Sequence, residues 1–205
     1  MKEKVLFVIL EQYADWECAF LVTALQGRIK DRTTNYEVNT VSLSKNPIKS
    51  IGGFTTVPDY GIEDIPNDYA AFILVGGMSW RTDDAKRFAP IVKKAFADGK
   101  IVGAICDATV FLGMNGLLNE RKHTSNTKDD LVSAAQDAYT GSEKYLMEQT
   151  VRDGNLITAN GTAYLEFTRE VLTALEAYPP DYIAENYDFF RLGFIEFLKS
   201  AASQN

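Results

Sequence analysis

The chain contains only one histidine, His123, and only two cysteines, Cys18 and Cys106, among 205 residues. One imidazole excludes a His-rich metal site, and a structural zinc site needs more sulfur and nitrogen ligands than this chain has. We therefore expect no metal and no cofactor. With two cysteines and no export signal, reduced thiols and a cytoplasmic location are expected. A disulfide between the two cysteines stays open at this stage.

Basic residues and long apolar runs are also scarce. The 21 Lys and Arg are outnumbered by 28 Asp and Glu, which gives a net charge of −7. This balance argues against a nucleic-acid surface, which needs a basic face. No apolar run approaches the roughly 20 residues of a membrane span. The run at 5–10 is too short for a signal peptide and favours a first strand. We expect neither nucleic acid nor membrane as a partner.

Short apolar runs alternate with amphipathic stretches, which is typical of an α/β fold around a mostly parallel sheet. We expect strands at 4–10, 36–43, 69–75, 101–105 and 122–126, and helices at 15–29, 83–97, 108–114, 129–135 and 164–177. Hairpins are expected over 47–57 and at Asp153–Gly154. The length suits one domain over residues 1–205.

The segment 181–205 is an aromatic extension of this pattern. Its apolar residues fall roughly on one stripe: Ile183, Tyr187, Phe190, Phe194 and Phe197. We expect a terminal helix that packs on the body of the protein; the alternative is a stripe that faces a partner.

The most informative stretch lies at 101–109, where an apolar run stops at Cys106 and small residues then open a helical pattern. This arrangement resembles a nucleophile elbow, a tight strand-to-helix turn that carries a reactive side chain. The turn lifts the sulfur out of the sheet, and the new helix directs N–H groups and partial positive charge at it. Both effects favour thiolate, the nucleophilic form. The alternative is an inert, buried cysteine at a strand end.

Two further features fall at the carboxyl ends of expected strands, where open parallel sheets bind ligands. Gly76 and Gly77 follow one strand, and they are either a plain turn or a backbone that donates N–H groups to an oxyanion. Asp15 and Glu17 begin the helix after the first strand, and they either cap that helix or approach the thiol. An ionised glutamate would raise the thiol pKa, whereas a protonated one could donate a hydrogen bond and lower it.

Four short motifs occur in a telling order: Ala-Asp-Trp-Glu at 14–17, Leu-Val-Gly-Gly at 74–77, Gly-Ala-Ile-Cys at 103–106 and Asp-Gly-Asn-Leu-Ile-Thr at 153–158. With them, residues 3–177 resemble the ThiJ/PfpI family of the class I glutamine-amidotransferase-like superfamily. The resemblance implies a flavodoxin-like three-layer sandwich with a mostly parallel sheet, and a homodimer. Family members include cysteine peptidases, chaperones, glyoxalases or deglycases, and redox-responsive stress proteins.

Carried over by position, the resemblance makes Cys106 the nucleophile and Glu17 its carboxyl partner. The backbone N–H groups of Gly77 and Asp107 would form the oxyanion hole. In the peptidase branch the residue after the nucleophile is histidine, so Asp107 is a departure.

Other branches carry a later histidine, and that position falls on Asn126. His123 lies three residues earlier, so strand alternation places it on the opposite face from Cys106. The catalytic dyad therefore lacks a secure second member.

The residues and the resemblance together favour a cysteine-dependent hydrolase, either a peptidase or amidase or a deglycase- or glyoxalase-like enzyme, with weak general proteolysis. The resemblance implies a small carbonyl compound or a peptide as substrate. The alternatives are a redox or electrophile sensor that uses an oxidisable Cys106, and a binding module that has lost turnover.

Overall fold

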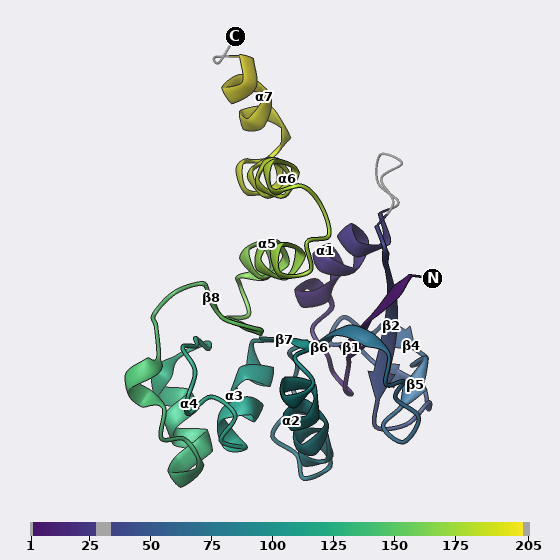
Figure 1. Ribbon diagram of the computed structural model, residues 1–205, viewed down its shortest axis with the longest axis vertical. Coiled ribbons are helices and arrows are strands. Elements are labelled where there is room, and N and C mark those ends of the chain that lie inside the picture. The colour runs from purple at the N-terminus through teal and green to yellow at the C-terminus, as the bar shows by residue number, and fades with distance from the viewer. Residues whose placement is uncertain (1, 28–33, 203–205) are drawn as a thin grey trace.

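The computed structural model describes residues 2–27 and 34–202, which are built around a seven-stranded sheet (Figure 1). The strand order is β5-β2-β1-β6-β7-β9-β8, and only β8 runs antiparallel to its neighbour. The strands are β1 (Glu3–Val8), β2 (Tyr36–Ser42), β5 (Tyr60–Gly61), β6 (Tyr69–Leu74), β7 (Ile101–Ile105), β8 (Thr150–Asp153) and β9 (Leu156–Ala159). The expected flavodoxin-like α/β architecture is confirmed.

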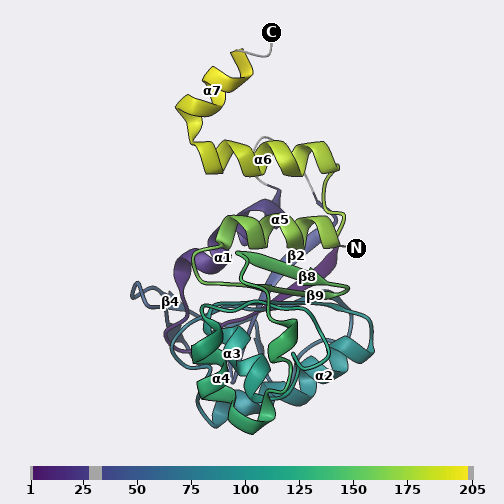
Figure 2. The same cartoon turned by 90° about the vertical axis from the view of Figure 1, so that its left-hand side faces the viewer.

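Helices cover both faces of the sheet (Figures 1 and 2). One face carries α1 (Asp15–Gln26) and α5 (Tyr164–Ala174), and the other carries α2 (Ala89–Ala97), α3 (Asp107–Met114) and α4 (Lys128–Ala135). Strand β1 is buried on both faces of the sheet: Leu6 belongs to one apolar core and Phe7 to the other. A strand buried on both faces reads as a continuous apolar run, which is why it was visible in the sequence.

The order of the strands indicates where this sheet would bind a ligand. Strand β1 has β2 on one side and β6 on the other, so the strand order reverses there. The carboxyl ends of β1, β6 and β7 meet at this switch point, where open α/β sheets bind ligands. The expected hairpin over 47–57 is formed by β3 (Ile48–Lys49) and β4 (Thr55–Thr56), which pair antiparallel. No described helix is both long and apolar enough to cross a membrane.

Three expected elements differ in the structure: the helix over 83–97, the strand at 122–126 and the single helix of the aromatic extension. The helix over 83–97 is a 3₁₀ segment (Asp84–Phe88) followed by α2, because Pro90 has no N–H and suits a first helical turn. Two other short 3₁₀ segments follow α4, at Gln136–Ala138 and Ser142–Lys144. The first helix is confirmed to Gln26, and the expected continuation to Ile29 lies outside the described residues.

The expected strand at 122–126 is wrong. This segment is irregular and makes one isolated bridge, from His123 to Tyr145. The sheet position beside β9 is occupied by β8, and segment 122–126 joins neither of these strands in a ladder. A side chain replaces the ladder: the Thr158 hydroxyl accepts a hydrogen bond from the N–H of Thr124 at 2.9 Å.

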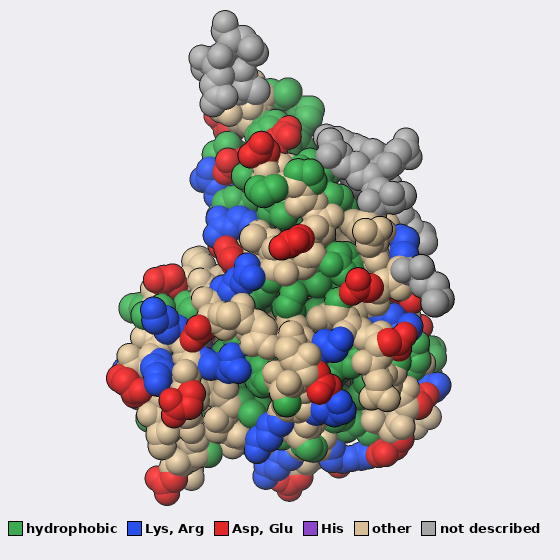
Figure 3. Space-filling view, in the orientation of Figure 1, with side chains coloured by type: hydrophobic (Ala, Val, Ile, Leu, Met, Phe, Trp, Pro, Cys, Tyr) green, Lys and Arg blue, Asp and Glu red, His purple; other side chains and the backbone are tan. Residues whose placement is uncertain are grey.

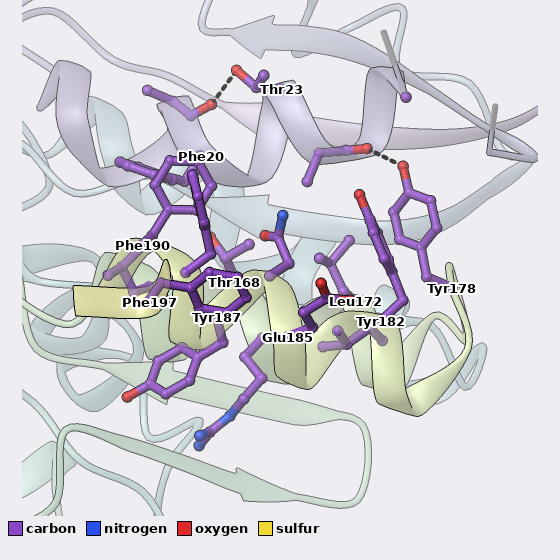
Figure 4. A pocket seen from close by; sticks show the side chains of 18 of the residues that line it. Phe20, Thr23, Thr168, Leu172, Tyr178, Tyr182, Glu185, Tyr187, Phe190 and Phe197 are labelled. Atoms are coloured by element: carbon purple, nitrogen blue, oxygen red, sulfur yellow. Dashed lines mark hydrogen bonds between the residues drawn. The ribbon is translucent and has the colours of Figure 1, made fainter. Parts of the chain in front are cut away.

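The aromatic extension forms two helices rather than one. Helix α6 (Pro180–Leu192) ends at Gly193, whose φ of 81° breaks the helix, and α7 (Phe194–Ala202) follows. Helix α6 packs against α5, and α7 packs mainly against α6 and projects away from the sheet (Figure 2). A cavity of about 520 Å³ lies between these helices and α1, lined largely by aromatic and aliphatic side chains (Figure 4). Packing on the body is therefore confirmed for α6 only.

Candidate active site

Cys106 occupies the turn between β7 and α3, and its backbone has φ 60° and ψ −130°. A positive φ is unusual for a residue with a side chain and costs on the order of 1–3 kcal/mol, which the surrounding structure must offset. The Cys106 N–H donates to the Ala159 carbonyl at 2.9 Å, and the Thr109 hydroxyl donates to the Cys106 carbonyl at 2.6 Å. The geometry is that of the nucleophile elbow expected from the sequence.

Glu17, in the first turn of α1, lies beside the Cys106 thiol, and Gly76 and Gly161 pack closely on both side chains. The Glu17 side chain is 1% exposed. A Cβ on Gly76 would lie 2.1 Å from Glu17 Oε2 and 2.6 Å from Cys106 Cβ. A Cβ on Gly161 would lie 2.9 Å from Cys106 Sγ and 3.0 Å from Glu17 Oε1. Only glycine fits at either position, and the carboxyl and thiol are thereby brought together.

Burial dominates the electrostatics of this pair. It raises the pKa of Glu17 to about 7, and neither carboxyl oxygen makes a well-formed hydrogen bond within the described part of the chain. Burial and then the charge on Glu17 raise the pKa of the Cys106 thiol to about 12, against the weaker pull of the Asn126 amide. The helix N–H of Asp107 lowers the thiol pKa, as expected for the turn, but burial and the charge on Glu17 outweigh it. Thiol and carboxyl titrate as a pair.

Asn126 lies at the site, as its position in the family pattern implied. Its Nδ2 donates to Cys106 Sγ at 3.3 Å, and its Oδ1 accepts from the Gly161 N–H at 2.8 Å. The amide faces the sulfur from a loop rather than from a strand.

The two candidate oxyanion donors differ in surroundings. Gly77 packs so closely on the segment after β1 that a Cβ would lie 2.5 Å from the Gln12 carbonyl oxygen. The Asp107 N–H is near enough to the sulfur to lower the pKa of Cys106. The Asp107 carboxylate turns away, to the Arg81 guanidinium, which also binds Asp130 on α4.

Arg81 and Gly161 are site residues that sequence reasoning missed. Arg81 follows the Gly-Gly turn by four residues, but nothing local marks it as the partner of two carboxylates. A glycine after the last strand was the available signal for Gly161, because close backbone approach at a strand end is a common reason for glycine.

His123 does not serve the thiol. Its Nδ1 pairs with the Arg121 carbonyl and its Nε2 with the Tyr139 hydroxyl, each at 2.7 Å, and its side chain is fully buried. The opposite orientation expected for it is confirmed, although by these contacts and not by strand alternation. Burial lowers its pKa.

We expect His123→Ala to reduce stability and to leave Cys106 chemistry within severalfold of wild type. Loss of buried packing and two hydrogen bonds costs on the order of 2–4 kcal/mol, measured by urea unfolding. Because the folded-state pKa lies below the unfolded value, this histidine favours folding above about pH 6.5 and the benefit is lost on acidification. If Cys106 in the folded His123→Ala variant were alkylated about 100-fold more slowly than in wild type, the conclusion that His123 does not act on the thiol would be wrong.

The remaining cysteine lies elsewhere on α1. Cys18 Sγ donates to the Asp15 carbonyl at 3.6 Å, and burial raises its pKa to about 12. Both cysteines are free thiols, so the disulfide left open above is excluded. Among residues 2–27 and 34–202, no group of His, Cys, Asp or Glu side chains is arranged to hold a metal ion.

Comparison with known proteins agrees with this fold. The model of the DJ-1/PfpI family matches residues 3–174. A Bacillus subtilis protein named uncharacterized protease YdeA is 41% identical over 95% of this chain and 94% of its own length. A Pyrococcus abyssi protein named a deglycase is 28% identical over 76% of this chain and 89% of its own. The crystal structure of a ThiJ/PfpI family protein from Bacillus anthracis superposes with a TM-score of 0.87 at 28% identity, covering 97% of this chain and 94% of the other. The chain belongs to the DJ-1/PfpI family.

Proposed function

We propose that the protein is a cysteine-dependent enzyme of the hydrolase type that acts on small, electrophilic carbonyl compounds, with Cys106 as nucleophile. The observation that carries this proposal is the buried Glu17 carboxyl against a thiol on a nucleophile elbow. A carboxyl without a good hydrogen-bond partner in the described structure is an available proton acceptor.

The proton inventory of the pair supports this role. With pKa values of about 7 for Glu17 and about 12 for Cys106, the pair holds one proton between these limits. Transfer of that proton from sulfur to Glu17 creates the thiolate. The thiolate adds to the carbonyl carbon, the π electrons move to oxygen, and the resulting alkoxide takes a proton back from Glu17 to give a hemithioacetal. In the adduct of a 2-oxoaldehyde, a proton shift between the two adjacent carbons gives a thioester, and water then cleaves the thioester to a 2-hydroxy acid and restores the thiol. The N–H groups of Gly77 and Asp107 are our candidates for stabilising that alkoxide.

Peptide hydrolysis requires a proton donor for the leaving amine in addition to an activated nucleophile. An amine leaves only when an acid protonates it, a task that imidazole performs near neutral pH. The one imidazole of this chain is bound to Arg121 and Tyr139. Asp107, paired with Arg81, and the neutral Asn126 are poor substitutes. Of the two activities that the relatives' names suggest, protease and deglycase, the geometry favours the second.

We expect the purified protein to consume methylglyoxal faster than it cleaves casein or fluorogenic peptides. Thiolate addition to an activated carbonyl needs no leaving group, which is why the aldehyde makes the smaller demand. The measurement compares steady-state rates on both substrate classes at pH 8. Brisk peptide cleavage without aldehyde consumption would overturn the proposal and would require a base from a residue not identified above.

The second candidate is a redox or electrophile sensor. The partly exposed Cys106 receives N–H donation from Asn126 and lies beside Glu17, groups that would stabilise an oxidised, anionic sulfur. In the same assays, this function would give no turnover on either substrate, together with rapid peroxide oxidation of Cys106.

We also propose that two copies of the chain associate. Beyond the family resemblance, this rests on the apolar surface of α6 and α7, where large side chains are exposed: Phe190, Leu192, Phe194, Ile195 and Leu198. Hydrophobic side chains gather over this part of the molecule in Figure 3. Contiguous apolar patches of this kind usually mark interfaces.

A further inference from the structure

A run of hydrogen bonds leads from the start of α1 to the sulfur. The indole N–H of Trp16 donates to the Gly161 carbonyl at 3.1 Å. The N–H of Gly161 donates to Asn126 Oδ1 at 2.8 Å, and Asn126 Nδ2 donates to Cys106 Sγ at 3.3 Å. These contacts join three segments that are remote in sequence: the β1–α1 junction, the loop before α4 and the loop before α5.

The orientation of the Asn126 amide decides its effect on the sulfur. With nitrogen toward Cys106 it donates to the thiolate and favours ionisation; with oxygen toward Cys106 it accepts from the thiol and opposes ionisation. The Asn126 side chain is exposed, so water competes for it and both orientations are open to it. The Gly161 N–H selects the donating orientation, because only the amide oxygen can accept that hydrogen bond.

Gly161 needs an external anchor to perform this task. It cannot carry a side chain, since a Cβ would lie 2.9 Å from the Cys106 sulfur. Because glycine has no side chain to pack, the backbone of Gly161 is conformationally less restricted than that of any other residue type. The hydrogen bond from Trp16 fixes its carbonyl, while Asn160 orders the next residue by accepting from the Thr162 N–H at 3.0 Å.

Trp16 itself has no other evident reason to be held in this way. Its side chain is 46% exposed, so the ring is not required as core. An indole N–H directed at a backbone carbonyl beside the thiol is a specific contact. We propose that Trp16 is a positioning residue of this site: it holds Gly161 in place and thereby keeps the amide nitrogen of Asn126 directed at the Cys106 sulfur.

The charged groups around the sulfur remain unchanged in the test. They are Glu17 from α1 and the Asp107 carboxylate from α3, which is paired with Arg81. A change in Cys106 ionisation on substitution of Trp16 therefore reports the hydrogen-bond path. The inference concerns the site of the proposed function, but alkylation of the thiol tests it without any turnover.

The experiment measures the rate of Cys106 alkylation by iodoacetamide against pH, in a Cys18→Ser background. Trp16→Phe keeps an aromatic ring and removes the N–H. We expect alkylation at pH 8 to slow by about three- to tenfold, the usual weight of one hydrogen bond, with the profile displaced to higher pH. Tyr36→Phe is the matched control, because it removes an aromatic donor to the Leu175 carbonyl away from the site; its profile should match wild type.

A double-mutant cycle separates positioning from other roles. Asn126→Ala should slow alkylation at least as much as Trp16→Phe, and adding Trp16→Phe to it should cause no further change. An unaltered profile in Trp16→Phe would overturn the inference. So would an equal loss in the presence and absence of Asn126, because Trp16 would then act by another route. If the cycle behaves as expected while no carbonyl substrate is consumed, the proposed function fails and the positioning role stands.

Discussion

Cys106→Ser is expected to abolish the consumption of methylglyoxal, with a loss on the order of 10⁴-fold or more, as for other enzymes that lose their nucleophile. A hydroxyl gives up its proton far less readily than a thiol does, so a carboxylate with a pKa of about 7 cannot generate the alkoxide. The smaller oxygen also lies farther from a carbonyl placed for attack by sulfur. Steady-state rates of wild type and variant at equal folded concentration give the measurement.

Cys18→Ser is the matched control. The Cys18 thiol lies one residue from Glu17 on the same helix, but it donates to the Asp15 carbonyl at 3.6 Å rather than facing the carboxyl. The rate of Cys18→Ser should stay within about twofold of wild type, because the change replaces one atom and leaves the Glu17 carboxyl and the Cys106 thiol in place. Mass spectrometry after mild alkylation should find the label at Cys106. Preferential labelling of Cys18, or activity that survives in Cys106→Ser, would remove Cys106 from the mechanism.

The elbow was predictable because its signal is local. An apolar run that is buried on both faces identifies a central strand, and a cysteine followed by small residues identifies the turn after it. The convergence of Glu17, Gly76 and Cys106 followed from one topological rule, that the carboxyl ends of parallel strands meet at one edge. The clash distances at Gly76 make this convergence concrete.

What escaped prediction depends on contacts between loops. Arg81 binds two carboxylates on α3 and α4, and no periodicity links these three positions. Segment 122–126 joins no strand of the sheet and makes one isolated bridge, from His123 to Tyr145, a contact between loops that no sequence pattern marks. The net direction of the thiol pKa did not follow from the sequence, because the helix terminus was visible there, whereas the burial of the sulfur was not.

Glu17→Gln is expected to lower turnover at pH 8 by about 100-fold or more, the usual contribution of a positioned proton acceptor. Glutamine preserves the shape of the side chain but cannot take the thiol proton. Wild-type kcat/KM should rise with pH through about 7, as Glu17 ionises, and this limb should be missing in the variant. Glu185→Gln, at an exposed position of α6 that lines the cavity beside α1 and not the thiol site, controls for loss of one negative charge and should keep the limb.

The stability of the same variant provides a second and opposite readout. The folded-state pKa of Glu17, about 7, lies above its ordinary value of 4.5, so the folded protein binds the extra proton and loses stability as pH rises through about 7. Glu17→Gln removes that penalty, and we expect it to be more resistant to urea than wild type at pH 8. A carboxyl that costs stability yet raises activity is typical of a catalytic group. If Glu17→Gln instead keeps the pH limb and full turnover, Glu17 is only a carboxylate at the start of a helix.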